Sequence, residues 1–114
     1  AIGPYVQATL VNGFLFTSGQ IALDPTSNTI VDGDIRVQTR QVCTNLTNVL
    51  KAAGMDASNV VKTTCFIKDM NDFGKVNAIY AEYINGPVLP ARSCVEVAAL
   101  PKGGLVEIEV IAKK

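Results

Sequence analysis

The segment from Pro90 to Ala112 constrains the fold more than any other part of this 114-residue chain. It contains two runs of alternating polar and apolar residues, Arg92–Ala98 and Leu105–Ala112, and each run predicts a β-strand. The Pro-Lys-Gly-Gly sequence at 101–104, between the two runs, is typical of a turn. We therefore expect the chain to end in two strands joined by a short loop.

Side chains alternate between the two faces of a strand, which assigns each residue of these runs to a face. Arg92, Cys94 and Glu96 share one face of the first strand, and Glu107 and Glu109 share one face of the second. If the strands pair with their apolar faces together, Arg92 and Glu107 lie on the same opposite face. A guanidinium, a carboxylate and a thiol then share one sheet surface, with the pairing register left open.

The start of the chain predicts a β-hairpin. Asn12-Gly13 separates two strand-like runs, Tyr5–Val11 and Phe14–Ile21, and suits a type I′ turn because both residues tolerate positive φ. A two-residue loop also fixes the register of the hairpin. The residues that share one face at the end away from the turn are Tyr5, Gln7, Ser18 and Gln20.

Two helices and one further strand are expected between these regions. Apolar residues at helical spacing predict a helix from Ile35 to about Ala53, with Asp34 as its N-cap. Val60–Ile67 alternates and is rich in β-branched residues, which favours a strand. A second amphipathic pattern predicts a helix from Asn71 or Asp72 to Ile84. Its apolar side is expected to carry Phe73, Val76, Tyr80, Tyr83 and Ile84.

The resulting order, ββαβαββ, predicts one α+β domain over residues 1–114. We expect a two-layer α/β sandwich, in which two helices cover one face of a single mixed sheet. The other face is expected to carry Arg92, Cys94, Glu107 and the group around Tyr5 and Ser18. Such a surface, with bulky apolar neighbours, is most simply covered by other copies of the same chain.

Composition excludes several classes of function. Ten basic and ten acidic residues give zero net charge, which argues against strong binding of nucleic-acid phosphates. The sequence has no histidine, the commonest general base and metal ligand. The spacing of its three cysteines indicates neither a zinc site nor a disulfide framework, so we expect no metal.

The cysteines also indicate a cellular compartment. Unpaired cysteines fit a reducing compartment, and we expect a cytoplasmic protein. The sequence has no signal peptide and no apolar run of about 18 residues. It begins at Ala1 rather than at Met, so we expect a few leading residues to be missing. A mitochondrial location follows if a missing leading segment targets the protein there.

Several motifs together resemble the Rid family of reactive intermediate (imine) deaminases, also called YjgF-like or L-PSP endoribonuclease-like proteins. The main motif is Pro-Ala-Arg-Ser-x-Val-x-Val-Ala-x-Leu at 90–100, followed by Val-Glu-Ile at 106–108. The other motifs are Ile2-Gly3-Pro4-Tyr5, Thr17-Ser18-Gly19-Gln20, Val61-Lys62-Thr63-Thr64, Asn71-Asp72-Phe73 and Val76-Asn77. The resemblance covers nearly the whole chain. It implies a chorismate-mutase-like fold and a homotrimer, with ligand sites in clefts between subunits.

The resemblance also implies roles for two charged residues. Arg92 matches the arginine that holds the substrate carboxylate, a role that suits a planar bidentate donor. Glu107 matches the glutamate that holds and activates the attacking water. From the residues alone, Arg92 could equally form a surface ion pair, and most glutamates on such a strand are simply solvated.

The remaining candidates are expected to bind substrate. Tyr5, Ser18, Gly19 and Asn77 match residues that line the pocket of the family. Cys94 also matches a pocket position, and we assign it binding rather than covalent catalysis because no histidine is present to activate its thiol.

The predicted activity is hydrolysis of 2-imino acids and their enamine tautomers, which arise from serine or threonine dehydration, to 2-keto acids and ammonia. This is the reaction of a 2-iminobutanoate/2-iminopropanoate deaminase. An imine carbon is already electrophilic, so we expect no cofactor. Two alternatives are a regulatory protein that binds small acids without turnover, and a translation inhibitor or ribonuclease that acts on RNA. Zero net charge, no histidine and 6% aromatic residues argue against the RNA alternative.

Overall fold

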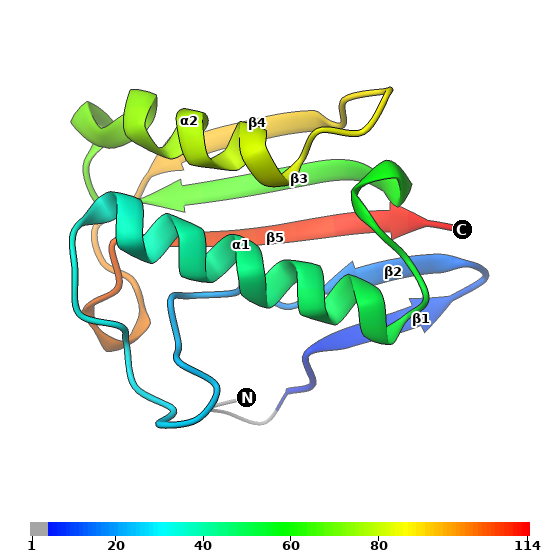
Figure 1. The fold of residues 1–114 in the computed structure, drawn as a ribbon, viewed down its shortest axis with the longest axis horizontal. Helices are drawn as coiled ribbons and strands as arrows, with labels where there is room; N and C mark the ends of the chain where they lie inside the picture. The colour runs from blue at the N-terminus through cyan, green and yellow to red at the C-terminus, as the bar shows by residue number, and fades with distance from the viewer. Residues whose placement is uncertain (1–4) are drawn as a thin grey trace.

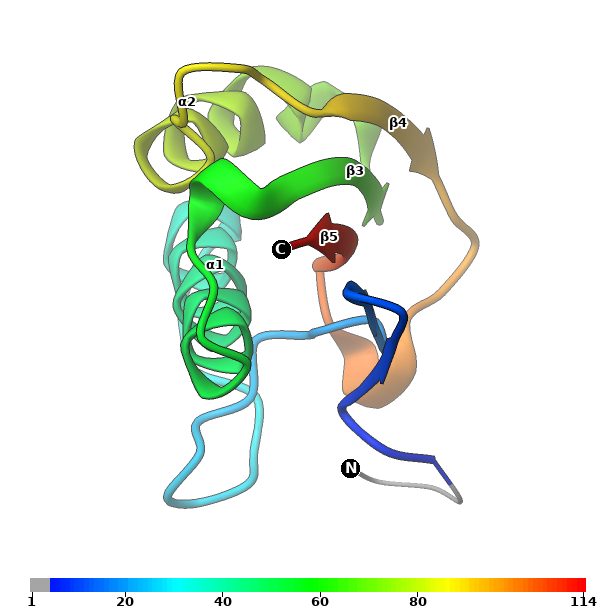
Figure 2. The same cartoon turned by 90° about the vertical axis from the view of Figure 1, so that its right-hand side faces the viewer.

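The computed structural model of the chain describes residues 5–114 (Figure 1). One mixed five-stranded sheet, in the order β1-β2-β5-β3-β4, carries both helices on one face, as the edge-on view shows (Figure 2). This arrangement confirms the predicted two-layer α+β fold. The strands are β1 (Ala8–Val11), β2 (Phe14–Thr17), β3 (Val60–Ile67), β4 (Ala91–Glu96) and β5 (Val106–Lys113).

The helices are α1 (Ile35–Ala52) and α2 (Phe73–Tyr83), and three short 3₁₀ turns lie at Ala57–Asn59, Met70–Asp72 and Pro101–Gly103. Asp34 caps α1, as predicted, by accepting hydrogen bonds from the backbone N–H groups of Arg36 and Val37 at 3.0 and 3.1 Å. In the described part of the chain, no helix has the length and apolar character needed to span a membrane.

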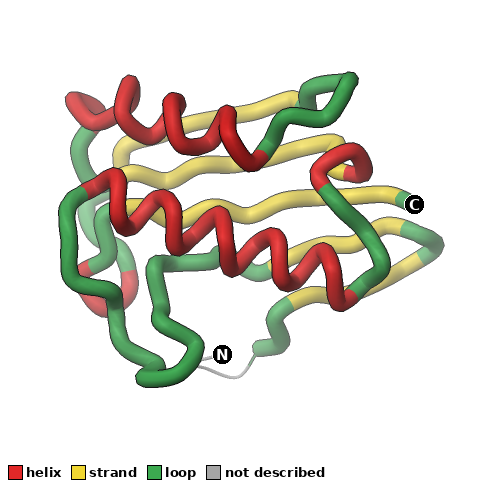
Figure 3. Tube along the Cα trace, viewed as in Figure 1, coloured by secondary structure: helices red, strands yellow, loops and turns green. Residues whose placement is uncertain are grey.

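The β1–β2 hairpin has the predicted turn and register. Asn12 and Gly13 have φ values of 51° and 81°, the positive values that a type I′ turn requires. Val11 lies opposite Phe14 in the strand pair. After β2 the chain follows an irregular path over residues 18–34 to the start of α1 (Figure 3), and on this path Gln20 still forms an antiparallel bridge with Ile108 of β5.

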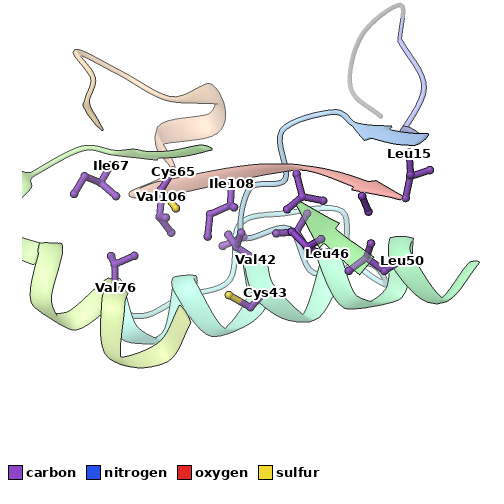
Figure 4. Close-up of a cluster of buried hydrophobic side chains, with 14 of the residues drawn as sticks. Leu15, Val42, Cys43, Leu46, Leu50, Cys65, Ile67, Val76, Val106 and Ile108 are labelled. Carbon is purple, nitrogen blue, oxygen red and sulfur yellow. The ribbon is translucent and has the colours of Figure 1, made fainter. Parts of the chain in front are cut away.

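The core lies between the sheet and the two helices (Figure 4). Val42 and Leu46 of α1 and Val106 and Ile108 of β5 are each at most 2% exposed. Burial of side chains of this size stabilises the fold by roughly 1.5–3 kcal/mol each. This core makes the sheet and helices one rigid frame on which site residues are held.

The expected pairing of the last two strands is wrong, because β3 lies between them. β3 pairs with β4 in parallel and with β5 in antiparallel orientation. β4 follows β3 through a crossover that contains α2, and such a crossover returns the chain parallel to the strand it left. Alternation identified both strands correctly, but alternation carries no information about which strands are neighbours.

This topology places Arg92 and Glu107 on opposite faces of the sheet, which corrects the expectation of a shared face. In the β3–β4 register, Arg92 lies beside Thr63 and Cys94 beside Cys65, and both β3 residues are fully buried. Arg92 and Cys94 are therefore on the face that the helices cover. Glu107 pairs with Phe66, whose side chain alternates to the open face.

Candidate functional site

The candidate residues form two clusters, one on each face of the sheet. We call Asn77, Arg92 and Cys94, with Phe73 and Tyr80, the Arg92 half-site. We call Tyr5, Ser18, Gly19 and Glu107 the Glu107 half-site. Within one chain the sheet separates the two half-sites, so Arg92 and Glu107 are not brought together.

In the Arg92 half-site, a single helix supplies three groups that contact the guanidinium. Arg92 Nη1 donates a hydrogen bond to Asn77 Oδ1 at 2.6 Å. The guanidinium carbon also lies 4.9 Å from the centroid of the Tyr80 ring and 5.4 Å from that of Phe73. Residues 73, 77 and 80 are spaced by four and three positions, which places them on one face of a helix.

Sequence reasoning missed Phe73 and Tyr80 as site residues, because both were assigned only to the apolar side of the second helix. Their spacing from Asn77 was the available signal. Tyr80 is also fixed to the sheet, since its hydroxyl lies 2.8 Å from Thr63 Oγ1. Because Thr63 is the β3 neighbour of Arg92, helix and sheet together determine where the Tyr80 ring meets the guanidinium.

A groove of about 310 Å³ lies beside Arg92, between α2 and the segment that leads into β4. Its walls are mostly apolar, and the residues that line it are Asn77, Tyr80, Ala81, Ile84, Leu89, Pro90 and Arg92. The groove therefore offers apolar contact beside a cation, an arrangement that suits a small organic acid.

Cys94 is half-buried, and its thiol interacts with that of Cys65 on the neighbouring strand. Burial raises the pKa of Cys94, although the positive charge of Arg92 acts in the opposite direction. A thiol with a raised pKa is mostly protonated at neutral pH, and the thiol is a weak nucleophile compared with the thiolate. This environment argues against covalent catalysis by Cys94, and its assignment to binding stays a prediction.

In the Glu107 half-site, the carboxylate lies directly over Gly19. A Cβ atom on Gly19 would lie 2.6 Å from Glu107 Cδ, which is closer than two carbon atoms can approach. Partial burial raises the pKa of Glu107, and repulsion from Glu109 raises it further. A carboxylate with this shift is a stronger base than an ordinary glutamate.

Hydrogen bonds hold the 18–20 segment beside Glu107. Gln20 and Ile108 exchange two backbone hydrogen bonds, of 2.8 and 3.0 Å. Ser18 Oγ donates to the Val6 carbonyl at 2.5 Å, so this hydroxyl ties down the segment that carries Tyr5. Tyr5, Gly19 and Glu107 all line one small hollow of about 40 Å³.

Among residues 5–114, no three histidine, cysteine, aspartate or glutamate side chains are arranged to hold a metal ion. The two half-sites offer a guanidinium held by Asn77 and a partly buried carboxylate.

Comparisons with known proteins identify the family of the chain. The family model described as Endoribonuclease L-PSP matches residues 1–114. The mouse protein named 2-iminobutanoate/2-iminopropanoate deaminase is 54% identical over 112 residues, covering 98% of this chain and 82% of the mouse protein.

Two solved structures share the fold over the full length of the chain. The structure of a Rid family protein from Yersinia pestis has a TM-score of 0.96 and 54% identity, covering 100% of this chain and 90% of that one. The structure of TdcF from E. coli with bound serine has a TM-score of 0.92 and 40% identity, with coverages of 100% and 91%. The resemblance found in the motifs is thereby confirmed: this chain belongs to the Rid, or endoribonuclease L-PSP, family.

Proposed function

We propose that the protein hydrolyses 2-imino acids, such as 2-iminobutanoate and 2-iminopropanoate, to 2-keto acids and ammonia in clefts between the subunits of a homotrimer. The observation that carries this proposal is the separation of Arg92 and Glu107 on opposite faces of one sheet. A small substrate that needs both groups must take them from different subunits. The name of the mouse relative supports the choice of reaction.

In this proposal Arg92 binds the substrate carboxylate. A guanidinium has five N–H donors, and the bond to Asn77 occupies one nitrogen, which leaves donors for a bidentate contact. The TdcF relative was solved with serine, which carries a carboxylate on the carbon next to its amino group, as a 2-imino acid carries one next to its C=N. The apolar groove beside Arg92 accommodates the alkyl part of the substrate.

Glu107 of a neighbouring subunit acts as the base. The imine enters with its nitrogen protonated. Glu107 accepts a proton from water while the water oxygen bonds to the imine carbon, which gives a carbinolamine. Glu107 then gives this proton to the carbinolamine nitrogen. As the C–N bond breaks and ammonia leaves, Glu107 accepts the hydroxyl proton, the keto group forms, and the proton passes to the ammonia. The raised pKa of Glu107 suits these transfers near neutral pH.

The open face of the sheet supports the proposed assembly. Phe14 and Phe16 on β2 and Val95 on β4 are 36%, 45% and 43% exposed in the single chain. All three alternate away from the helices, and residues 5–114 leave them exposed. Packing of this face against other copies would remove these apolar groups from water.

Mixing two inactive variants tests both the reaction and the shared cleft. Arg92→Ala and Glu107→Gln proteins are each assayed with freshly generated 2-iminopropanoate, then unfolded, mixed in equal amounts and refolded. If each cleft takes Arg92 from one subunit and Glu107 from another, about one quarter of the clefts in the mixture contain both groups and regain activity. A mixture that stays inactive would contradict the shared cleft. A parent protein that does not hydrolyse the imine would contradict the proposed activity.

The regulatory alternative uses the same Arg92 half-site. A protein that only senses small acids would bind a 2-keto acid but would not convert the imine faster than water does. The turnover assay of the parent protein, with Glu107→Gln as its matched control, therefore separates a sensor from an enzyme.

A further inference from the structure

We propose that Phe73 and Tyr80 are positioning residues, which hold the Arg92 guanidinium in the orientation that its carboxylate ligand needs. The inference rests on the proposed function, because the ligand is the carboxylate of the imino or keto acid. Neither aromatic residue needs to touch the reacting atoms. They act by orienting the Arg92 guanidinium, which donates hydrogen bonds to the ligand carboxylate.

An arginine side chain has many rotamers, and immobilising them on binding costs affinity. In this structure α2 restricts Arg92 before any ligand arrives. Asn77 accepts one hydrogen bond, and the two rings lie 4.9 and 5.4 Å from the guanidinium carbon. Contacts between a guanidinium and a ring face leave the N–H groups at the edge of the guanidinium plane available.

The rings are held differently, which makes their contributions separable. Tyr80 is half-buried and bonds to Thr63 on β3, the strand beside Arg92, so its ring is fixed to the sheet. Phe73 is 37% exposed at the first turn of α2. We therefore expect Tyr80 to restrict the guanidinium more strongly than Phe73 does.

The chain also offers a matched control. Arg40 lies over the ring of Tyr83, one turn after Tyr80 on the same helix, at 6.0 Å. Arg40 pairs with Glu82 at the surface and lies outside both half-sites. Replacing Tyr83 removes the same kind of arginine–tyrosine contact without touching Arg92.

The test is a double-mutant cycle with binding of 2-oxobutanoate as its readout, measured by calorimetry on variants whose assembly is checked by light scattering. Tyr80→Leu and Phe73→Leu are each made in the parent and in Arg92→Lys, whose ammonium is a point charge without a plane to orient. In the parent we expect about 10–30-fold weaker binding for Tyr80→Leu and about 3–10-fold for Phe73→Leu. In the Arg92→Lys background both losses should fall below about threefold.

Two further variants sharpen the result. Tyr80→Phe keeps the ring but loses the bond to Thr63, so its loss should be smaller than that of Tyr80→Leu. Tyr83→Leu should bind like the parent. Because the Phe73 ring is partly exposed, Phe73→Leu keeps the cycle usable even if Tyr80→Leu does not fold.

Equal losses in both backgrounds would overturn the inference, because a ring that only supports the fold, or only contacts the ligand, does not depend on Arg92. Parent-like binding by both ring variants would overturn it as well. If Arg92→Lys weakens binding while the ring variants do not, only this inference fails. If the parent protein does not bind 2-oxobutanoate at all, the proposed function fails with it.

Discussion

The two half-sites are built by different means. The Arg92 half-site stands on regular structure, since one face of α2 and the edge strand β4 supply all of its groups. In the Glu107 half-site only the carboxylate stands on a strand, β5. Its other residues come from the stretches on either side of the β1–β2 hairpin, which hydrogen bonds tie to the sheet.

In the proposed function, this difference separates binding from chemistry. Arg92 has three contacts with α2, so the loss of any one of them should weaken binding gradually. Glu107 depends on a close approach to Gly19, where no space remains for a side chain. A single added methyl group there should therefore have a large effect on rate.

The largest effect should come from Glu107→Gln. Glutamine keeps the size and hydrogen-bonding capacity of glutamate but cannot accept a proton, so turnover should fall by about 10²–10⁴. Binding of 2-oxobutanoate should stay nearly unchanged, because Arg92 is intact. Stopped-flow turnover of 2-iminopropanoate and calorimetry measure the two quantities. Normal turnover would assign the proton transfer to another group or to water.

Arg92→Lys should have the next largest effect and should act on both quantities. Lysine keeps the charge but loses the paired planar donors, which should cost roughly 2–4 kcal/mol in the transition state. Binding of the keto acid should weaken together with turnover, since the same contact positions the C=N bond. Binding as tight as in the parent would mean that the carboxylate is held elsewhere.

Gly19→Ala tests the close approach of the Glu107 carboxylate to Gly19 by changing the glycine. The φ of Gly19 is not positive, so alanine adds no backbone strain, and its effect must come from displacement of the Glu107 carboxylate. We expect turnover to fall by about 10–100-fold with keto-acid binding less affected. Gly74→Ala is the control, because a Cβ at Gly74 meets no atom within 4 Å. Similar losses in both variants would count against the steric explanation.

Cys94→Ser should have a smaller effect. Burial raises the pKa of the thiol, so we assign it contact with the ligand and no covalent step. Turnover should stay within about fivefold of the parent. Mass spectrometry of the protein quenched during turnover provides the second readout, and a covalent adduct at Cys94 would overturn the assignment.

The sequence predicted the elements of the fold better than it predicted their arrangement. The Asn-Gly turn, the α1 cap and the strand β3 were all identified, because each depends on neighbouring residues only. The pairing of the last two strands was wrong, because β3, distant in sequence, lies between them. The prediction that Arg92 and Glu107 share one face of the sheet was wrong for the same reason.

The site residues show the same limit. The family motifs named Asn77, Arg92 and Glu107 individually, yet the contact between Asn77 and Arg92 depends on where α2 packs against β4. Phe73 and Tyr80 were assigned to an apolar stripe, which is the usual role of aromatic residues at helical spacing. Only the packed structure shows that the Tyr80 ring, which packs against the core, also meets a guanidinium.

The smallest expected effect concerns the stability of the Glu107 half-site at different pH values. The pKa of Glu107 is raised in the folded chain, first by burial and then by Glu109, so the folded state binds this proton more tightly than the unfolded state does. At pH values above the raised pKa the ionised carboxylate lowers stability, and protonation relieves this cost as the pH falls through that pKa. Glu107→Gln should therefore unfold at a slightly higher temperature than the parent at pH 7. The difference should shrink as the pH falls through the raised pKa and should be lost below the ordinary pKa of a glutamate.

Thermal unfolding of both proteins at pH 7 and pH 4 measures this difference. Glu109→Gln serves as the control, because it removes the second cause of the shift and leaves burial in place. In Glu109→Gln, the pH at which turnover falls on acidification should be slightly lower than in the parent. It should still be higher than the pKa of an ordinary glutamate. If Glu107→Gln were less stable than the parent at pH 7, the carboxylate would be stabilising, and its basicity could not come from burial. The Glu107 half-site would then resemble the Arg92 half-site, with a charge held by favourable contacts rather than at a cost.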